Sequence, residues 1–326
     1  MTLDSSALRT PGAVLLDRQV RMLRTAMGPA IAAALADPQV LEIQLNPDGR
    51  MWLDRLGEGC GDSGLKVTPQ DAERIIRLVA SHLHIEVNAA KPFISAELPE
   101  TGERFSGVLP PVTRAPAFAI RKRAIQIISL AQYVVDGFMS EEQALALRQA
   151  VRERRNIVIA GGTGTGKTTL ANTLLQEIAA TGDRVLTLED TPELQCSAQN
   201  ALSLRTHRGV ATMGDLTREI LGYSPDRIIV GEVRGAEALA MLKAWATGHP
   251  GGVTTLHSNS AHGALLRLES LVQEAVVTVS PTLIAQAVDI VVFLSRRAAQ
   301  RRVEEMIRVR GQRGGEYHIE PLQPSL

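Results

Sequence analysis

Apolar and polar positions alternate in two short runs near the start of the chain. Residues 38–56 place these runs on either side of Pro47-Asp48-Gly49, a turn sequence, and so predict a hairpin. Thr68 is a typical N-cap residue, and Pro69 suits the first turn of a helix. Apolar residues then recur at helical spacing, so the sequence predicts a helix over 69–84. From 94 to 123 the pattern returns to short strands that glycine and proline interrupt. We therefore expect a small α+β domain here.

A different pattern begins near residue 136. The segment Ser140-Glu141-Glu142-Gln143 has the spacing of a capping box and predicts the start of a helix. Beyond it, mainly apolar strands, of the kind that are buried, alternate with helical stretches, which predicts an α/β domain with a mainly parallel sheet and helices on both faces. The predicted strands are 156–160, 184–188, 227–230, 253–256 and 290–294. We therefore divide the chain into an α+β domain, 1–135, and an α/β domain, 136–326.

The composition narrows the class of protein. The chain has 326 residues, 44% hydrophobic and 21% charged, with 35 basic and 35 acidic side chains. Zero net charge argues against a protein that mainly coats nucleic acid, and a 3% aromatic content argues against a base-stacking surface. The two distant cysteines, Cys60 and Cys196, argue against a disulfide framework and a four-thiolate zinc site. No secretory signal or membrane-spanning run is evident, so we expect a cytoplasmic protein, peripheral to a membrane at most.

The strongest chemical signal is a phosphate-binding loop. The residues GGTGTGKT at 161–168, hereafter the phosphate loop, match G-x-x-x-x-G-K-[ST], follow an apolar strand and lead into a helix. Glycines in such a loop let backbone N–H groups and the helix N-terminus face a phosphate chain. Lys167 would reach the β and γ phosphates of ATP, and the Thr168 hydroxyl would bind Mg²⁺. The predicted nucleotide-binding residues are Gly161, Gly162, Thr163, Gly164, Thr165, Gly166, Lys167, Thr168 and Thr169.

Acidic residues follow two other predicted strands of the same sheet. Glu189 and Asp190 end one strand, and Glu232 comes shortly after another. Because ligands gather at the carboxyl ends of the strands in such sheets, we expect these acids near the phosphate loop. Hydrolysis of ATP needs an acid for the attacking water and another near the metal. We assign Glu232 to the water and leave the metal-side acid among Glu189, Asp190 and Glu193, with Asp190 as the working assignment.

A histidine ends a further predicted strand at the same edge. His257 directly follows the strand 253–256, behind a glycine-rich loop. Its position favours a role in sensing the γ-phosphate, and a purely structural histidine is the alternative.

Two segments concentrate arginine and lysine. Residues 114–123 carry four positive charges and no acid, and residues 296–313 carry seven arginines against two glutamates. For the second segment we favour a solvated face or a strand edge, and contact with DNA is the alternative.

Four sequence boxes together resemble the nucleotide site of the secretion or traffic ATPases, which power type II and type IV secretion, pilus motors and conjugal DNA transfer. The boxes are GGTGTGKTT at 161–169, TLEDTPEL at 187–194, PDRIIVGEVRGAEA at 225–238 and TGHPGGVTTLHSNS at 247–260. The resemblance implies a homohexameric ring of RecA-like P-loop ATPase domains, each joined to an N-terminal domain that closes over the nucleotide.

The resemblance also implies roles for individual residues. Glu189 and Asp190 would form the family's acidic box, Glu232 would be the catalytic glutamate, and His257 would belong to the histidine box. Arginines of the N-terminal domain would approach the γ-phosphate and stabilise its transition-state charge. Four residues resemble those arginines, with Arg121 and Arg104 as the first candidates: Arg104, Arg114, Arg121 and Arg123.

Within the family, the chain resembles the conjugation and type IV secretion branch. The absence of a tetracysteine insertion and the Asn-Ser ending of the histidine box favour that branch. We therefore expect a hexameric ATPase that uses ATP and Mg²⁺ and works with inner-membrane components of a secretion or conjugation machine, in pilus assembly or export. It would be cytoplasmic and peripheral to the inner membrane, and direct DNA binding is not favoured. The alternatives are a pilus-retraction motor and a nucleotide-gated assembly factor with little turnover.

Overall fold

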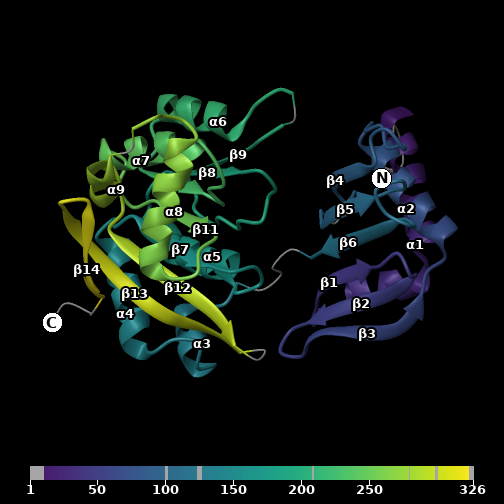
Figure 1. The fold of residues 1–326 in the computed structure, drawn as a ribbon, viewed down its shortest axis with the longest axis horizontal. Helices are drawn as coiled ribbons and strands as arrows, with labels where there is room; N and C mark the ends of the chain where they lie inside the picture. Colours follow the sequence, from purple (N-terminus) through teal and green to yellow (C-terminus); the bar gives the residue numbers. More distant parts are fainter. Residues whose placement is uncertain are drawn as a thin grey trace, which may run out of the picture. The chain divides into compact units, whose positions relative to one another are not determined.

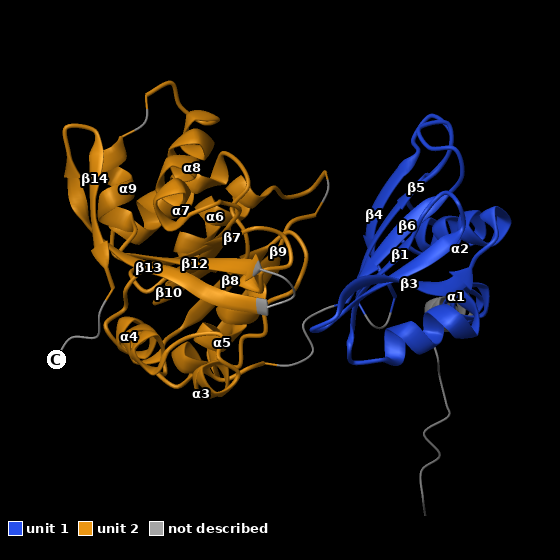
Figure 2. Cartoon of the chain, turned by 60° about the horizontal axis from the view of Figure 1, so that its bottom comes forward, with its two compact units in different colours: residues 1–125 blue, residues 126–326 orange. Residues whose placement is uncertain are grey.

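The computed structural model describes residues 11–99, 102–122, 127–207, 209–278, 280–297 and 300–322. The chain forms two compact units, residues 1–125 and 126–326 (Figure 2). The predicted boundary at residue 136 falls inside the second unit, because a short helix, α3 (Leu130–Val135), packs on α4 (Glu141–Arg152) of that unit. Across the described residues, no helix combines the length and the apolar character needed to cross a membrane.

The first unit is a six-stranded antiparallel sheet with two helices packed on it (Figure 1). The strand order is β3-β2-β1-β6-β5-β4. The predicted hairpin and the helix behind Thr68 are present, and the Thr68 side chain caps that helix by accepting a hydrogen bond from the backbone N–H of Asp71. The elements are α1 (Pro11–Ala36), β1 (Val40–Leu45), β2 (Arg50–Arg55), β3 (Gly59–Lys66), α2 (Pro69–His82), β4 (Phe93–Glu97), β5 (Arg104–Val108) and β6 (Ala117–Arg121).

The second unit is an eight-stranded sheet with helices on both faces. Its strand order is β14-β13-β12-β7-β11-β10-β8-β9, and the strands from β12 to β9 run parallel. Besides α3 and α4, the elements are β7 (Ile157–Gly161), α5 (Lys167–Ala179), β8 (Val185–Glu189), β9 (Ala201–Arg205), α6 (Met213–Glu219), the 3-10 helix η1 (Ile220–Tyr223), β10 (Arg227–Val230), α7 (Glu237–Ala246), β11 (Val253–Leu256), α8 (Ala261–Gln273), α9 (Pro281–Ala287), β12 (Ile290–Arg297), β13 (Gln300–Arg313) and β14 (Glu316–Pro321). The predicted fold class, an α+β unit followed by an α/β unit with a mainly parallel sheet, is confirmed.

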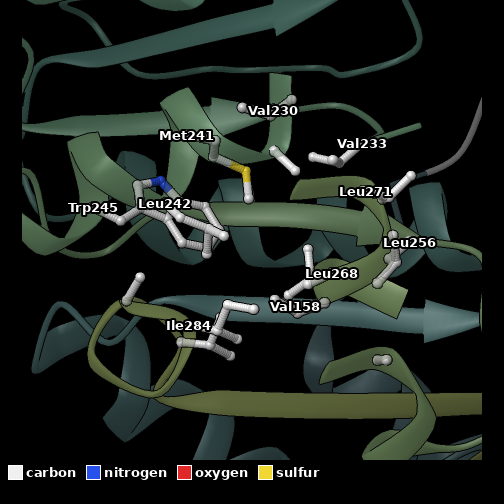
Figure 3. Close-up of a cluster of buried hydrophobic side chains, with 14 of the residues drawn as sticks. Val158, Val230, Val233, Met241, Leu242, Trp245, Leu256, Leu268, Leu271 and Ile284 are labelled. Carbon is white, nitrogen blue, oxygen red and sulfur yellow. The ribbon is translucent and has the colours of Figure 1, made fainter. Parts of the chain in front are cut away.

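The central strands are buried on both faces of the sheet. Every residue of β7, β8, β10 and β11 is buried, as their mainly apolar sequences predict. Along β7 the side chains alternate, so Val158 joins the core beneath α7 and α8 while Ile157 and Ile159 join the core with α4 and α5. Figure 3 shows the first of these cores, with Met241 and Trp245 of α7 among its larger side chains. The central strands thus lie between two packed cores.

Candidate nucleotide-binding site

The phosphate loop joins the end of β7 to the start of α5. Gly164 and Gly166 have φ angles of 72° and 96°, in the left-handed region that favours glycine. At Gly161 a Cβ would lie 2.6 Å from the carbonyl oxygen of Leu294 on the neighbouring strand β12, so this position has no room for a side chain. Three of the loop's four glycines are therefore required, two for backbone conformation and one for close packing.

Lys167 is held inside the phosphate loop. Its side chain is 8% exposed, and Nζ donates to the carbonyl oxygens of Gly161, at 3.0 Å, and Gly162, at 2.8 Å. The hydroxyl of Thr165 also donates to Gly162, at 2.9 Å. The loop thus curls around a buried ammonium group at the helix N-terminus, which is where a phosphate chain would bind.

Thr168 contacts a carboxylate. Its Oγ1 lies 3.2 Å from Oε2 of Glu193, and the Glu193 carbonyl accepts from the side-chain amide of Asn172 at 3.1 Å. A hydroxyl beside a carboxylate is the kind of oxygen donor set that Mg²⁺ takes in nucleotide sites, together with phosphate and water. The residues present therefore fit a magnesium ion.

The three candidate acids separate into different positions. Glu189 is 6% exposed, and its Oε1 accepts from the backbone N–H groups of Glu193 and Leu194, both at 2.8 Å. Asp190 is exposed and accepts from the hydroxyl of Thr206 at 3.0 Å. Glu189 therefore fixes the loop that brings Glu193 to Thr168, whereas Asp190 bonds to the segment after β9.

Glu232 and His257 lie together at the ends of β10 and β11. Oε1 of Glu232 is 2.9 Å from Nε2 of His257, and Oε2 accepts from Nε of Arg234 at 2.7 Å. The Glu232 side chain is 20% exposed and that of His257 50% exposed. The hydroxyl of Thr255 donates to the Gly231 carbonyl at 2.7 Å and ties the two strand ends together. This leaves a half-buried carboxylate that an exposed imidazole and a guanidinium flank.

Gly231 occupies the position where many phosphate-loop proteins end a strand with aspartate. A Cβ at Gly231 would lie 3.0 Å from Cγ of Glu189, so the side chain of Glu189 fills the available space. The acid at this point of the sheet comes from β8 instead of β10.

The candidate arginines of the first unit lie on or next to adjacent strands. Arg104 of β5 and Arg121 of β6 stand directly opposite each other in the register, Arg104 half-buried and Arg121 exposed. Arg114 is exposed in the segment between the two strands, and Arg123 lies outside the described residues. Two strands thus bring the two preferred candidates to one place.

Reasoning from sequence missed Arg234 and two further arginines, Arg296 and Arg301, that lie against the phosphate loop. Arg234 stands two residues after Glu232, within the third sequence box, and that spacing in a turn is the signal that could have identified it.

This chain is similar to known proteins over residues of both units. A family model described as type II/IV secretion system protein matches residues 65–317. The conjugal transfer protein TrbB of Rhizobium radiobacter is 50% identical over 93% of this chain and 94% of its own length. The type IV secretion system protein PtlH of Bordetella pertussis is 33% identical over 82% of this chain and 88% of its own. Among solved structures, the pilus retraction motor PilT with bound ADP has the same fold, with a TM-score of 0.58 at 20% identity over 91% of this chain and 82% of that one.

Proposed function

Because the chain belongs to the type II/IV secretion system protein family of ATPases, we propose that it hydrolyses ATP to ADP and phosphate to drive a type IV secretion apparatus for conjugal DNA transfer. The observation that supports hydrolysis best is the order of groups along the sheet. Four adjacent strands lead to these groups. β7 runs into the phosphate loop, and β11 is followed directly by His257. β10 ends two residues before Glu232, and β8 ends at Glu189. Phosphate-binding, water-activating and metal-positioning groups therefore share one edge.

Each side chain has a definite part in this proposal. Lys167 and the loop backbone bind the phosphates of ATP, while Thr168 and Glu193 hold Mg²⁺. When bound, the metal neutralises negative charge on the phosphates. Glu232 accepts the proton of the attacking water, with Arg234 and His257 fixing its two oxygens. Glu189 keeps the loop in place.

The proposal includes a ring of six copies and a part for the first unit. Arg121 and Arg104 would reach the γ-phosphate when the first unit closes, and the like charge of this cross-strand pair suits a strongly anionic target. Native mass spectrometry of the full chain with and without a non-hydrolysable ATP analogue tests the ring. Monomers under both conditions would contradict it.

The relatives suggest the partners and the place of action. TrbB is named for conjugal transfer and PtlH for type IV secretion, so we expect this chain to act with inner-membrane components of such a machine, on the cytoplasmic side of the membrane.

Phosphate release from the purified full chain tests hydrolysis directly. We expect release that requires ATP and Mg²⁺, measured with and without phospholipid vesicles. A chain that binds ATP tightly but releases no phosphate under any of these conditions would instead be a nucleotide-gated assembly factor.

Replacing Glu193 by glutamine tests the metal site. The variant keeps the shape of the side chain but loses the charge beside Thr168, so the Mg²⁺ concentration for half-maximal phosphate release should rise about tenfold. Asp190→Asn is the matched control, because it removes the neighbouring carboxylate that bonds to Thr206. A larger effect of Asp190→Asn than of Glu193→Gln would return the metal-side role to Asp190.

A further inference from the structure

The ribbon formed by β12 and β13 extends beyond the end of β7. The last residue pair between β7 and β12 joins Gly161 to Leu294, whereas β12 continues to Arg297 and remains paired with β13. The two strands run side by side in Figures 1 and 2. Because the phosphate loop starts where β7 ends, the extended part of this ribbon lies beside the loop.

Two arginines of the ribbon face the phosphate loop. A Cβ at Gly164 would lie 3.3 Å from Nη1 of Arg296, and one at Gly166 would lie 3.7 Å from Cδ of Arg301. Both arginine side chains are half-buried. Burial raises the pKa of Tyr133 on α3 to about 12, and a hydrogen bond with Thr173 and the charge of Arg301 partly offset that rise, so Arg301 also lies near α3.

These two arginines are also direct cross-strand partners. Arg296 stands opposite Arg301 in the register of the ribbon, and like charges in that arrangement repel each other. An anion bound against both guanidinium groups relieves the repulsion, and phosphate oxygens match the planar donor geometry of arginine. Both residues are half-buried against the phosphate loop, so this pair is not part of the fully solvated face or strand edge expected for residues 296–313.

Two other arginines of the segment behave differently. Arg302 follows Arg301 on the same strand and is exposed, as alternation along a strand requires. Arg310 forms an ion pair with Glu320 of β14, with Nε 2.6 Å from Oε1. Only part of the arginine cluster is thus placed for a ligand at the phosphate loop.

We propose that Arg296 and Arg301 bind the α and β phosphates of the nucleotide. The backbone of a phosphate loop cradles these two phosphates, while its lysine reaches toward the γ-phosphate, and both arginines lie against the loop backbone. The inference rests on the proposed function of the site. It distinguishes this pair from Arg104 and Arg121, which are proposed to contact the γ-phosphate alone.

Binding of ADP and of a non-hydrolysable ATP analogue to Arg296→Gln and Arg301→Gln tests the proposal. Each variant of the full chain should raise the dissociation constant of both ligands about tenfold or more, because a charge-assisted bond to phosphate is lost. Arg302→Gln is the matched control, with the same change one residue away on the other face of the strand, and it should leave both constants as in the wild type. Circular dichroism checks folding.

Several results would overturn the proposal. Unchanged affinities in both glutamine variants would do so, as would a loss for the ATP analogue without a loss for ADP. Loss of DNA binding with unchanged nucleotide affinity would assign the pair to nucleic acid instead. If a glutamine variant does not fold, Arg296→Lys and Arg301→Lys keep the charge but not the planar donors, and unchanged affinity in both would equally contradict it. A wild-type chain that binds no nucleotide would contradict the proposed function itself.

Discussion

Replacing Glu232 by glutamine is expected to slow phosphate release by about a hundredfold or more while ATP still binds. The amide has the shape of the carboxylate but cannot accept the proton of the attacking water. Because the phosphate loop and Thr168 are unchanged, the dissociation constant of a non-hydrolysable ATP analogue should stay within about threefold of the wild type, less than the loss of one charged hydrogen bond would cause.

Single-turnover phosphate release and analogue binding, measured on the same preparation, check this prediction. Glu219→Gln is a suitable control, because it makes the same change at an exposed residue of α6. Wild-type turnover in Glu232→Gln would show that another group activates the water. A loss of analogue binding would show that Glu232 supports the bound nucleotide itself.

Lys167→Ala should remove nucleotide binding. The side chain is buried within the loop, where its ammonium already bonds to two carbonyl oxygens, so no other lysine can replace it there. Loss of its charge-assisted bonds to the phosphates should raise the dissociation constant of the ATP analogue about a hundredfold or more. Equilibrium binding of the analogue measures this directly.

The control for this change is Lys243→Ala, which removes an exposed lysine of α7 and should leave binding unchanged. Near-normal ATP affinity in Lys167→Ala would refute the assignment of the phosphate loop. Together with Glu232→Gln, the variant separates binding from chemistry, since one should lose the ligand and the other should keep it without turnover.

The central part of the site could be predicted because its determinants are local or follow from strand direction. The phosphate loop is one continuous segment, and its glycines and lysine are recognisable without tertiary information. Glu232 and His257 follow two buried strands, and the carboxyl ends of parallel strands meet at one edge. The structure accordingly places their side chains 2.9 Å apart.

The choice among the acids could not be predicted in the same way. Glu193 reaches Thr168 because two residues hold its loop by hydrogen bonds: Glu189, four residues earlier, and Asn172 of α5, which is 21 residues away in sequence. Asp190 is closer to the predicted strand, yet its side chain bonds to Thr206. Such a preference depends on tertiary contacts that no local pattern contains.

Strand register and an irregular backbone explain why two further features could not be predicted from the sequence. The facing of Arg296 and Arg301 depends on how β12 pairs with β13, and a shift of β13 by one residue would turn Arg301 to the other face. The helix α1 contains the non-helical Gly28 followed by Pro29, which interrupts the helical pattern that would have predicted it. The roles of Arg104 and Arg121 stay a prediction.

The close approach of Gly231 to Glu189 constrains how this site can change during evolution. A side chain added at 231 would start 3.0 Å from Cγ of Glu189, so Glu189 would have to shift by a few tenths of an ångström to admit it. The acid at the end of β8 and a larger residue at 231 therefore compete for the same space. We expect the two positions to change together among relatives, and expect the common aspartate to be accommodated best at 231 when Glu189 is shortened at the same time.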